Sequence, residues 1–146
     1  MVREQLARIL ASRHFARTTR LRRLLRFVVE QTLAGRAAEL KEYSIAIAVF
    51  DKPDTFDPRL DAIVRVQMRE MRVKLEAYYW AEGRDDNVVI CCFAGTYVPV
   101  FQTRETAPEG HVQSHVQSHV QGHVQTAFWN ARIDALQAFL VRKGEP

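Results

Sequence analysis

The segment that most constrains the fold runs from Val64 to Tyr78, where apolar residues recur with the period of an α-helix. Successive helical residues are about 100° apart, so five of these side chains share one face. This inner stripe consists of Val64, Met68, Met71, Leu75 and Tyr78. The spacing predicts a long helix, from about Arg59 to Ala81, that packs the stripe on a core and ends before Gly83.

A second apolar set lies on the opposite side of the same helix and consists of Ile63, Val66, Val73 and Ala77. The flank between the two sets carries Arg65, Arg69 and Arg72, and the other edge carries Gln67 and Lys74. A helix with one solvated side does not need valines there. In a DNA groove, arginines reach phosphates or guanine edges, and a small apolar side chain meets a thymine methyl group. Burial on two sides, or contact with a partner subunit, explains the same pattern.

Two amphipathic helices are predicted before this one. The first covers residues 2–12 and places Val2, Leu6, Ile9 and Leu10 on one face. The second starts at an N-cap, Thr18 or Thr19, and ends before Gly35, which suits the C′ position. Its apolar stripe consists of Leu21, Leu24, Leu25, Val28 and Leu33. Its other side carries Arg20, Arg22, Arg23 and Arg26, which either face solvent or contact phosphates.

Residues 36–40 predict a connector with room for one short strand, and residues 41–50 predict a short helix. That helix places Tyr43, Ile47 and Phe50 on one face, although its β-branched residues also allow a strand. The loop that follows ends with an aspartate and a proline, which together predict the start of the long helix. These two residues are Asp57 as the N-cap and Pro58 as the first helical residue.

Residues 88–93 and 96–101 are rich in β-branched and aromatic residues and predict a β-hairpin that turns at Ala94 and Gly95. Pro99 cannot donate a backbone hydrogen bond, so the second strand is expected at an edge. The predicted fold class is therefore α+β, mainly helical with one small hairpin.

The positive charge is concentrated in the first half of the chain. The net charge is +4, but residues 1–74 hold 16 Lys/Arg against nine Asp/Glu. A basic half indicates a polyanionic partner, with nucleic acid first and an anionic membrane surface second. Solvated surface arginines explain the same balance.

Several classes of function find no support in the residues. No stretch approaches the roughly 20 apolar residues of a membrane span, and Arg3, Glu4 and Arg8 exclude a secretory signal, so the chain is expected in the cytoplasm without a membrane partner. Cys91 and Cys92 are adjacent, which suits neither a mutual disulfide nor a zinc site. No catalytic set and no glycine-rich phosphate loop is evident, so neither an enzyme nor a cofactor is expected.

The order of the predicted elements is that of a winged helix-turn-helix. "VQMREMRVKLE" resembles the recognition-helix signature in the output domain of bacterial two-component response regulators, and the matching residues are Met68, Met71, Arg72, Lys74, Leu75 and Glu76. "FAGTYVPV" resembles the end of the wing, with Gly95 and Tyr97 matching. Residues 20–101 are also similar to an N-terminal module of bacterial adenylate-cyclase-like and tetratricopeptide regulators. Residues 1–17 differ from the output domain, because they look helical where that domain has a four-stranded sheet.

The resemblance implies binding of double-stranded DNA in transcription regulation, and it implies a set of contact residues. The residues expected in the groove are Arg65, Arg69 and Arg72, with Val66, Gln67 and Val73 against base edges. The residues expected at phosphates are Arg22, Arg23, Arg26 and Lys74, and Arg84 and Thr96 are expected to serve the wing. Residues 51–61 lie where response-regulator relatives contact RNA polymerase. The alternative is a protein-interaction module that keeps the winged fold and uses Val66 and Val73 against a partner.

The composition changes after the predicted domain, residues 1–102. Residues 103–126 predict a low-complexity linker with a four-residue HVQ repeat, and residues 127–143 predict an amphipathic helix. That helix is expected either to pair with its copy in a homodimer or to fold back on the domain. The repeat holds His111, His115, His119 and His123 without a carboxylate or cysteine, so it is interpreted as a spacer and not as a metal site.

Overall fold

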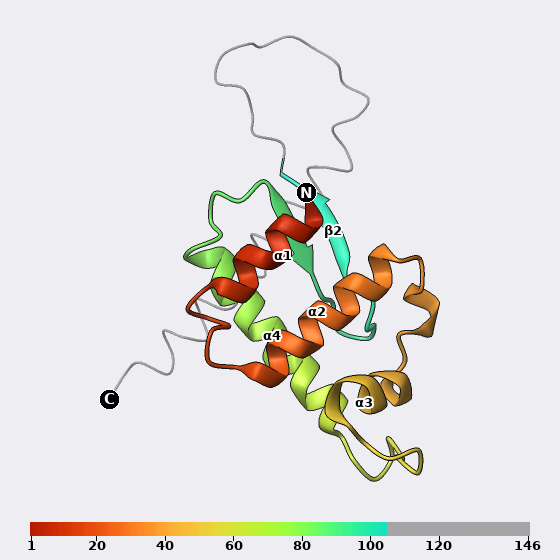
Figure 1. The fold of residues 1–146 in the computed structure, drawn as a ribbon. Coiled ribbons are helices and arrows are strands. Elements are labelled where there is room, and N and C mark those ends of the chain that lie inside the picture. The colour runs from red at the N-terminus through yellow and green to blue at the C-terminus, as the bar shows by residue number, and fades with distance from the viewer. Residues whose placement is uncertain (105–146) are drawn as a thin grey trace, which may run out of the picture. The chain divides into compact units, whose positions relative to one another are not determined.

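Four α-helices and one antiparallel hairpin make up residues 1–104, the part of the chain that the computed structural model describes (Figure 1). The helices are α1 (Val2–Ala11), α2 (Thr19–Leu33), α3 (Glu42–Phe50) and α4 (Ile63–Trp80), with a 3₁₀ helix, η1 (Ala37–Glu39), before α3. The hairpin consists of β1 (Val88–Cys91) and β2 (Val100–Thr103). The predicted α+β class is confirmed.

The inner stripe of α4 forms the centre of the core. All five of its predicted residues are buried, and Tyr79 is buried beside them. Helix α2 packs against both α3 and α4 and contributes Leu21, Leu24, Leu25, Val28 and Val29. In Figure 1, α1 and α2 lie in front of α4, and α3 lies at one end of the group. Each fully buried aliphatic side chain contributes about 1.5–3 kcal/mol to folding.

Helix α1 covers the other end of the core and packs against β1 and α2. Its predicted face is confirmed in part, because Leu6, Ile9 and Leu10 are buried while Val2 is only partly covered. A polar residue, Gln5, is buried on the same face. The turn after α1 adds Phe15 to the core, where it is fully buried.

Helix α4 begins at Ile63, four residues later than predicted. Residues 58–60 form a separate turn, because the backbone N–H groups of Leu60 and Asp61 both donate to the Asp57 carbonyl. The Asp57 carboxylate accepts the N–H of Arg59, and the Asp61 carboxylate accepts the N–H of Ile63 at 3.0 Å. The prediction of Asp57 as the N-cap is therefore wrong: the N-cap residue of α4 is Ala62, and the carboxylate that accepts the first helical N–H belongs to Asp61 before it.

The end of α4 requires a glycine shortly after it. Gly83 donates its N–H to the Tyr78 carbonyl at 2.8 Å, which folds the chain back under the helix. A Cβ atom at this position would lie 2.3 Å from the Tyr78 ring, well inside contact distance. The predicted end before Gly83 is confirmed, and the reason is this close approach of the two residues.

Two predicted details of α2 and α3 are wrong, and a third is right in position alone. Thr18 is the N-cap residue of α2 as predicted, but its hydroxyl donates to the Phe15 carbonyl and makes no capping hydrogen bond. Leu33, predicted in the apolar stripe, is exposed at the end of that helix. Gly35 does adopt the left-handed conformation that was predicted there, with φ of 77°.

Helix α3 forms as predicted, but it buries Ile45, Ala46 and Val49 in place of the predicted face. Tyr43 turns outward because its hydroxyl donates to the Asp54 carbonyl at 2.8 Å. Residues 37–39 form η1 and not a strand.

The hairpin is present, but its second strand begins four residues later than predicted. The register pairs Val88 with Thr103 and Cys91 with Val100, which leaves residues 92–99 as the hairpin loop. Pro99 lies in this loop immediately before β2, where its missing N–H costs no ladder bond. Thr103, the last residue of β2, lies one residue beyond the predicted domain end. Within residues 1–104 neither Cys91 nor Cys92 forms a disulfide bond.

Candidate nucleic-acid interface

The face of α4 opposite the core is exposed and carries both apolar and cationic side chains. Val66 and Val73 are 56% and 55% exposed, and Trp80 is 45% exposed near the end of the helix. Arg69 is exposed between the two valines. We call these four residues the outer face of α4. Its valines were predicted to point away from the core, and the structure confirms this.

The arginines of the described residues fall into two groups. Five of them lie within 3.4 Å of a carboxylate, namely Arg8, Arg13, Arg23, Arg59 and Arg65. Other cations have no carboxylate within 4.0 Å in residues 1–104, and five of these lie on α4, at the start of α2 or in the turn before it. These five, which we call the unpaired cations, are Arg17, Arg20, Arg69, Arg72 and Lys74. No carboxylate of residues 1–104 neutralises their charge at close range, and such charge attracts an anion.

An open hollow brings the start of α2 next to the middle of α4. It is lined by Arg17, Thr18, Thr19, Arg20, Leu21, Gln67 and Glu70. Gln67 was predicted as a base-edge residue, and here it lies beside two arginines that the set of predicted contacts left out. The Gln67 amide donates to Glu70 at 3.5 Å, so one carboxylate also belongs to this hollow. Arg17 was missed, and Arg20 was considered for phosphates only as part of α2, because their nearness to α4 depends on how two helices cross.

Arg65 is held by the protein itself, which changes its predicted role. Its guanidinium Nη1 lies 3.2 Å from one Glu42 carboxylate oxygen and 3.3 Å from the other. Its Nη2 donates to the Pro58 carbonyl at 3.1 Å. Arg65 thus ties the start of α4 to the first turn of α3, and in this state its charge is matched.

Arg72 lies on the side of α4 that faces the hairpin loop. Its charge acts on two residues of that loop, Cys92 and Tyr97, and taken alone it would lower the pKa of each. Burial and the neighbouring Cys91 outweigh it at Cys92 and raise the pKa of that thiol to about 12. At Tyr97, burial and the charge and hydrogen bonding of Glu42 raise the pKa above its usual value. The thiol is therefore a poor nucleophile at neutral pH.

The remaining predicted contacts are not gathered at α4. Arg23 pairs with Asp51 at 3.2 Å, Arg22 is half-buried with its Nε atom enclosed, and Arg26 is exposed on α2. Arg84 lies in the turn before β1, whereas Thr96 lies in the loop after it, where its hydroxyl accepts the Val98 N–H at 3.2 Å. The two residues predicted to serve one wing therefore lie at opposite ends of the hairpin.

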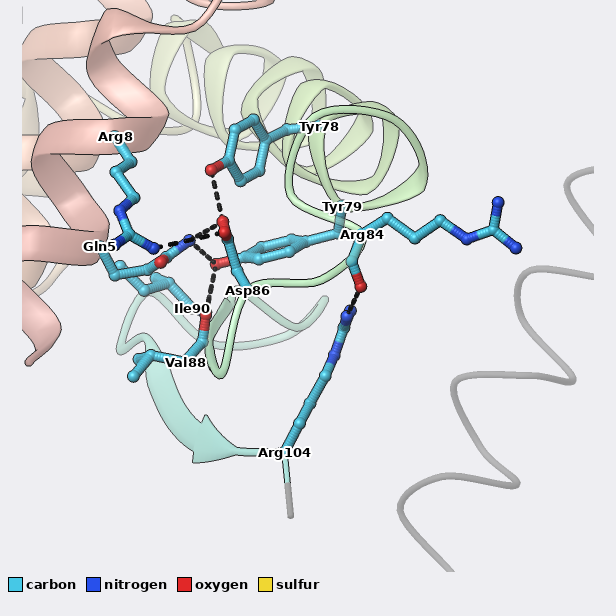
Figure 2. Close-up of polar contacts among 9 residues, drawn as sticks. All are labelled: Gln5, Arg8, Tyr78, Tyr79, Arg84, Asp86, Val88, Ile90 and Arg104. Atoms are coloured by element: carbon cyan, nitrogen blue, oxygen red, sulfur yellow. Dashed lines mark hydrogen bonds and ion pairs between the residues drawn. The ribbon is translucent and has the colours of Figure 1, made fainter. Parts of the chain in front are cut away.

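A polar network attaches the hairpin to α1 and α4 (Figure 2). Asp86 accepts hydrogen bonds from Tyr78 at 2.5 Å and from Gln5 at 2.7 Å, and Arg8 lies 3.4 Å from its other oxygen. The Tyr79 hydroxyl accepts the N–H of Ile90, inside β1, at 2.8 Å. The network fixes the direction in which the hairpin leaves α4, and with it the position of the hairpin loop.

The charge of Asp86 is stabilised by these contacts. Its partial burial raises the pKa, but the hydrogen bonds from Tyr78 and Gln5 and the charges of Arg8 and Arg104 outweigh it, so the pKa lies below the usual value. Burial and the hydrogen bond to Asp86 raise the pKa of Tyr78 well above its usual value. Arg104 also lies 5.8 Å from the centre of the Tyr79 ring and donates to the Arg84 carbonyl. Sequence reasoning missed this network, and the one signal that could have indicated it is the polar Gln5 on an apolar face of α1.

Comparisons of the chain with protein-family models, curated proteins and solved structures find no match. Within residues 1–104, no helix is both long and apolar enough to cross a membrane. The same residues contain no group of three or more histidine, cysteine or acidic side chains that could hold a metal ion. The predicted linker, the histidine repeat and the predicted C-terminal helix lie outside the described residues.

Proposed function

We propose that this protein binds double-stranded DNA through α4, in the manner of a winged helix-turn-helix, and regulates transcription. In this proposal α4 enters the major groove and residues 92–99 are the wing. The observation that carries the proposal is the set of unpaired cations on α4 and beside it, which have no carboxylate within 4.0 Å in residues 1–104. Such a distribution favours a polyanion over a neutral or basic partner.

The dimensions and chemistry of α4 suit this role. A helix of 18 residues is about 27 Å long, and the major groove of B-DNA is about 12 Å wide, enough for one helix. Arg69 reaches a base edge or a phosphate, and Val66 and Val73 meet thymine methyl groups. Arg17, Arg20 and Lys74 contact phosphates, which position the protein but carry no sequence information. Such a regulator works in the cytoplasm, on the DNA of a bacterial cell.

We propose that the α3–α4 loop, residues 51–62, contacts RNA polymerase. One exposed leucine is ordinary on a protein surface, but here Leu60 is 87% exposed on a loop that is anchored on both sides of it. The anchors are the Lys52–Asp61 ion pair at 2.9 Å, the hydrogen bond from Tyr43 to Asp54, and the one from Arg65 to Pro58. A loop held in this way presents Leu60 at little cost in conformational entropy.

The first test is fluorescence anisotropy of the full chain on duplex DNA, titrated from low to physiological salt. We expect log K to fall linearly with log salt, with a slope of about −0.9 per phosphate contacted. The double variant Arg69→Ala/Arg72→Ala is expected to bind about 1–3 kcal/mol more weakly if one of its arginines contacts a base edge. Thermal unfolding is measured alongside, to show that the variants remain folded.

A matched control removes two arginines elsewhere. Arg3→Ala/Arg36→Ala has the same net charge, and both side chains are exposed, one on α1 and one in the turn after α2. We expect this control to retain most of the affinity. Equal losses in the two double variants would reduce the interaction to general attraction by net charge, and an absence of binding by the folded wild type at low salt would refute the proposal.

One observation favours the alternative of a protein partner. Val66, Val73 and Trp80 are spaced by seven residues and are all exposed, which is the spacing of a seam between paired helices. A contact of this kind responds weakly to salt. If the wild type binds no DNA, Val66→Ser/Val73→Ser would be compared with wild type by sedimentation, and a loss of self-association would support this alternative.

A further inference from the structure

Glu42 lies at the point where three parts of the candidate interface meet. It is in the first turn of α3, where the helix dipole favours a negative charge. Its carboxylate lies against Arg65 at the start of α4, and its negative charge adds to burial in raising the pKa of Tyr97 in the hairpin loop. The side chain of Glu42 is only 16% exposed, whereas the side chain of Arg65 is 51% exposed.

We infer that Glu42 is an internal competitor for DNA, which occupies Arg65 and keeps this arginine from contributing fully to phosphate binding. The inference rests on the proposed function. A phosphate and the Glu42 carboxylate both bind the planar guanidinium through the same N–H donors. Arg65 must therefore exchange one anion for the other, or share its donors, when α4 approaches DNA. Neutralising Glu42 removes the competitor and leaves Arg65 with full charge at the start of α4.

The surroundings of the pair favour release of Arg65 over release of Glu42. Glu42 is nearly enclosed and is fixed by the helix it begins. Arg65 has a long side chain that is half exposed, and its remaining anchor is the neutral Pro58 carbonyl. Arg72 adds a second positive charge on the same side of α4, without a carboxylate of its own in residues 1–104. A phosphate that approaches Arg72 therefore also reaches the side of α4 on which Arg65 lies.

The test is a double-mutant cycle of Glu42→Gln and Arg65→Ala, with affinity for duplex DNA measured over a range of salt. Glu42→Gln is expected to tighten binding by about two- to fivefold, the equivalent of one exposed ion pair. The slope of log K against log salt is expected to become steeper by about 0.9, for one additional phosphate. When Arg65 is already alanine, Glu42→Gln is expected to change the affinity and the salt slope no more than a matched control substitution does.

That control is Glu70→Gln, which removes one carboxylate from the exposed side of α4 and gives the same net charge. Glu70→Gln is expected to increase the affinity by the same factor whether residue 65 is arginine or alanine, since Glu70 does not pair with Arg65. Glu42→Gln is not needed for a second test. Arg65→Ala alone is expected to weaken DNA binding less than Arg69→Ala does, and this comparison holds even if the Glu42→Gln protein does not fold. Thermal unfolding of each variant separates a loss of fold from a change in contact.

The outcomes separate this inference from the proposed function. If the wild type binds DNA and the effects of Glu42→Gln and Arg65→Ala are additive, the competitor role is refuted and DNA binding stands. The same holds if Arg65→Ala costs as much as Arg69→Ala in the wild-type background. If the folded wild type binds no DNA at low salt, the proposed function fails and this inference fails with it.

Discussion

At the scale of single residues, two adjacent tyrosines show how a polar group is accommodated in the core. Tyr78 belongs to the inner stripe of α4, and its hydroxyl donates to Asp86. Tyr79 follows it, and its hydroxyl accepts the N–H of Ile90. A buried hydroxyl without a partner costs roughly 1–3 kcal/mol, so both side chains are compatible with the core only because Asp86 and β1 supply partners. Asp86 is therefore the residue on which the attachment of the hairpin depends most.

A change of pH tests this role of Asp86. The pKa of Asp86 in the folded protein lies below the usual value of 3.8. Its charged form therefore stabilises the folded state above about pH 4, and this contribution is lost as the pH falls through the pKa of the folded protein. We expect Asp86→Asn to unfold at a lower temperature than wild type at pH 7, and the difference to narrow below about pH 4. Thermal unfolding from pH 2.5 to 7 measures this. Asp85→Asn, at the exposed neighbouring position, is the control, and a difference that is constant over the whole range would contradict the assignment.

At the scale of elements, α4 combines an inner face that stabilises the fold with an outer face that is free for a partner. We expect Met68→Ala to lower the free energy of unfolding by about 2–5 kcal/mol, because Met68 is buried and its removal leaves a cavity. Val73→Ala, at an exposed position five residues on, is expected to change it by less than about 0.5 kcal/mol. Urea unfolding of both variants measures the two values. Equal costs would mean that the outer face is also packed, which would remove it as a DNA surface.

The elements also show what could be predicted from the sequence. The inner stripe of α4 was predicted fully, because its spacing is a property of the helix alone. The start of α4, the buried face of α3 and the register of the hairpin were not, since each is decided by a contact with another segment. Asp61, and not Asp57, accepts the first N–H of α4, and the hydrogen bond of Tyr43 to Asp54 turned the Tyr43 side chain away from the core. The pairing of Arg65 with Glu42 joins residues 23 apart, and no local pattern indicates it.

At the scale of the whole molecule, the distribution of paired and unpaired charge matters more than the net charge of +4. The basic half of the sequence predicted a polyanionic partner, but five of its arginines are matched by carboxylates in the structure. The unpaired cations lie on α4, at the start of α2 and in the turn before α2. The α3–α4 loop carries the exposed Leu60, and its Lys52 and Arg59 are both matched by aspartates. This division places the proposed DNA contacts and the proposed polymerase contact on different elements.

Leu60→Ala tests whether the two contacts are separable. We expect this variant to bind DNA with wild-type affinity and to unfold at the wild-type temperature, because Leu60 contributes little to the core and lies on none of the elements that carry unpaired cations. In a reconstituted system with RNA polymerase and a promoter that carries a selected binding site, we expect the effect on transcription to fall by roughly three- to tenfold, as for an interface residue worth about 1 kcal/mol. The control is Leu33→Ala, another exposed leucine, at the end of α2. An equal loss of DNA affinity would place Leu60 in the DNA interface, and unchanged transcription would show that the loop serves only to join α3 to α4.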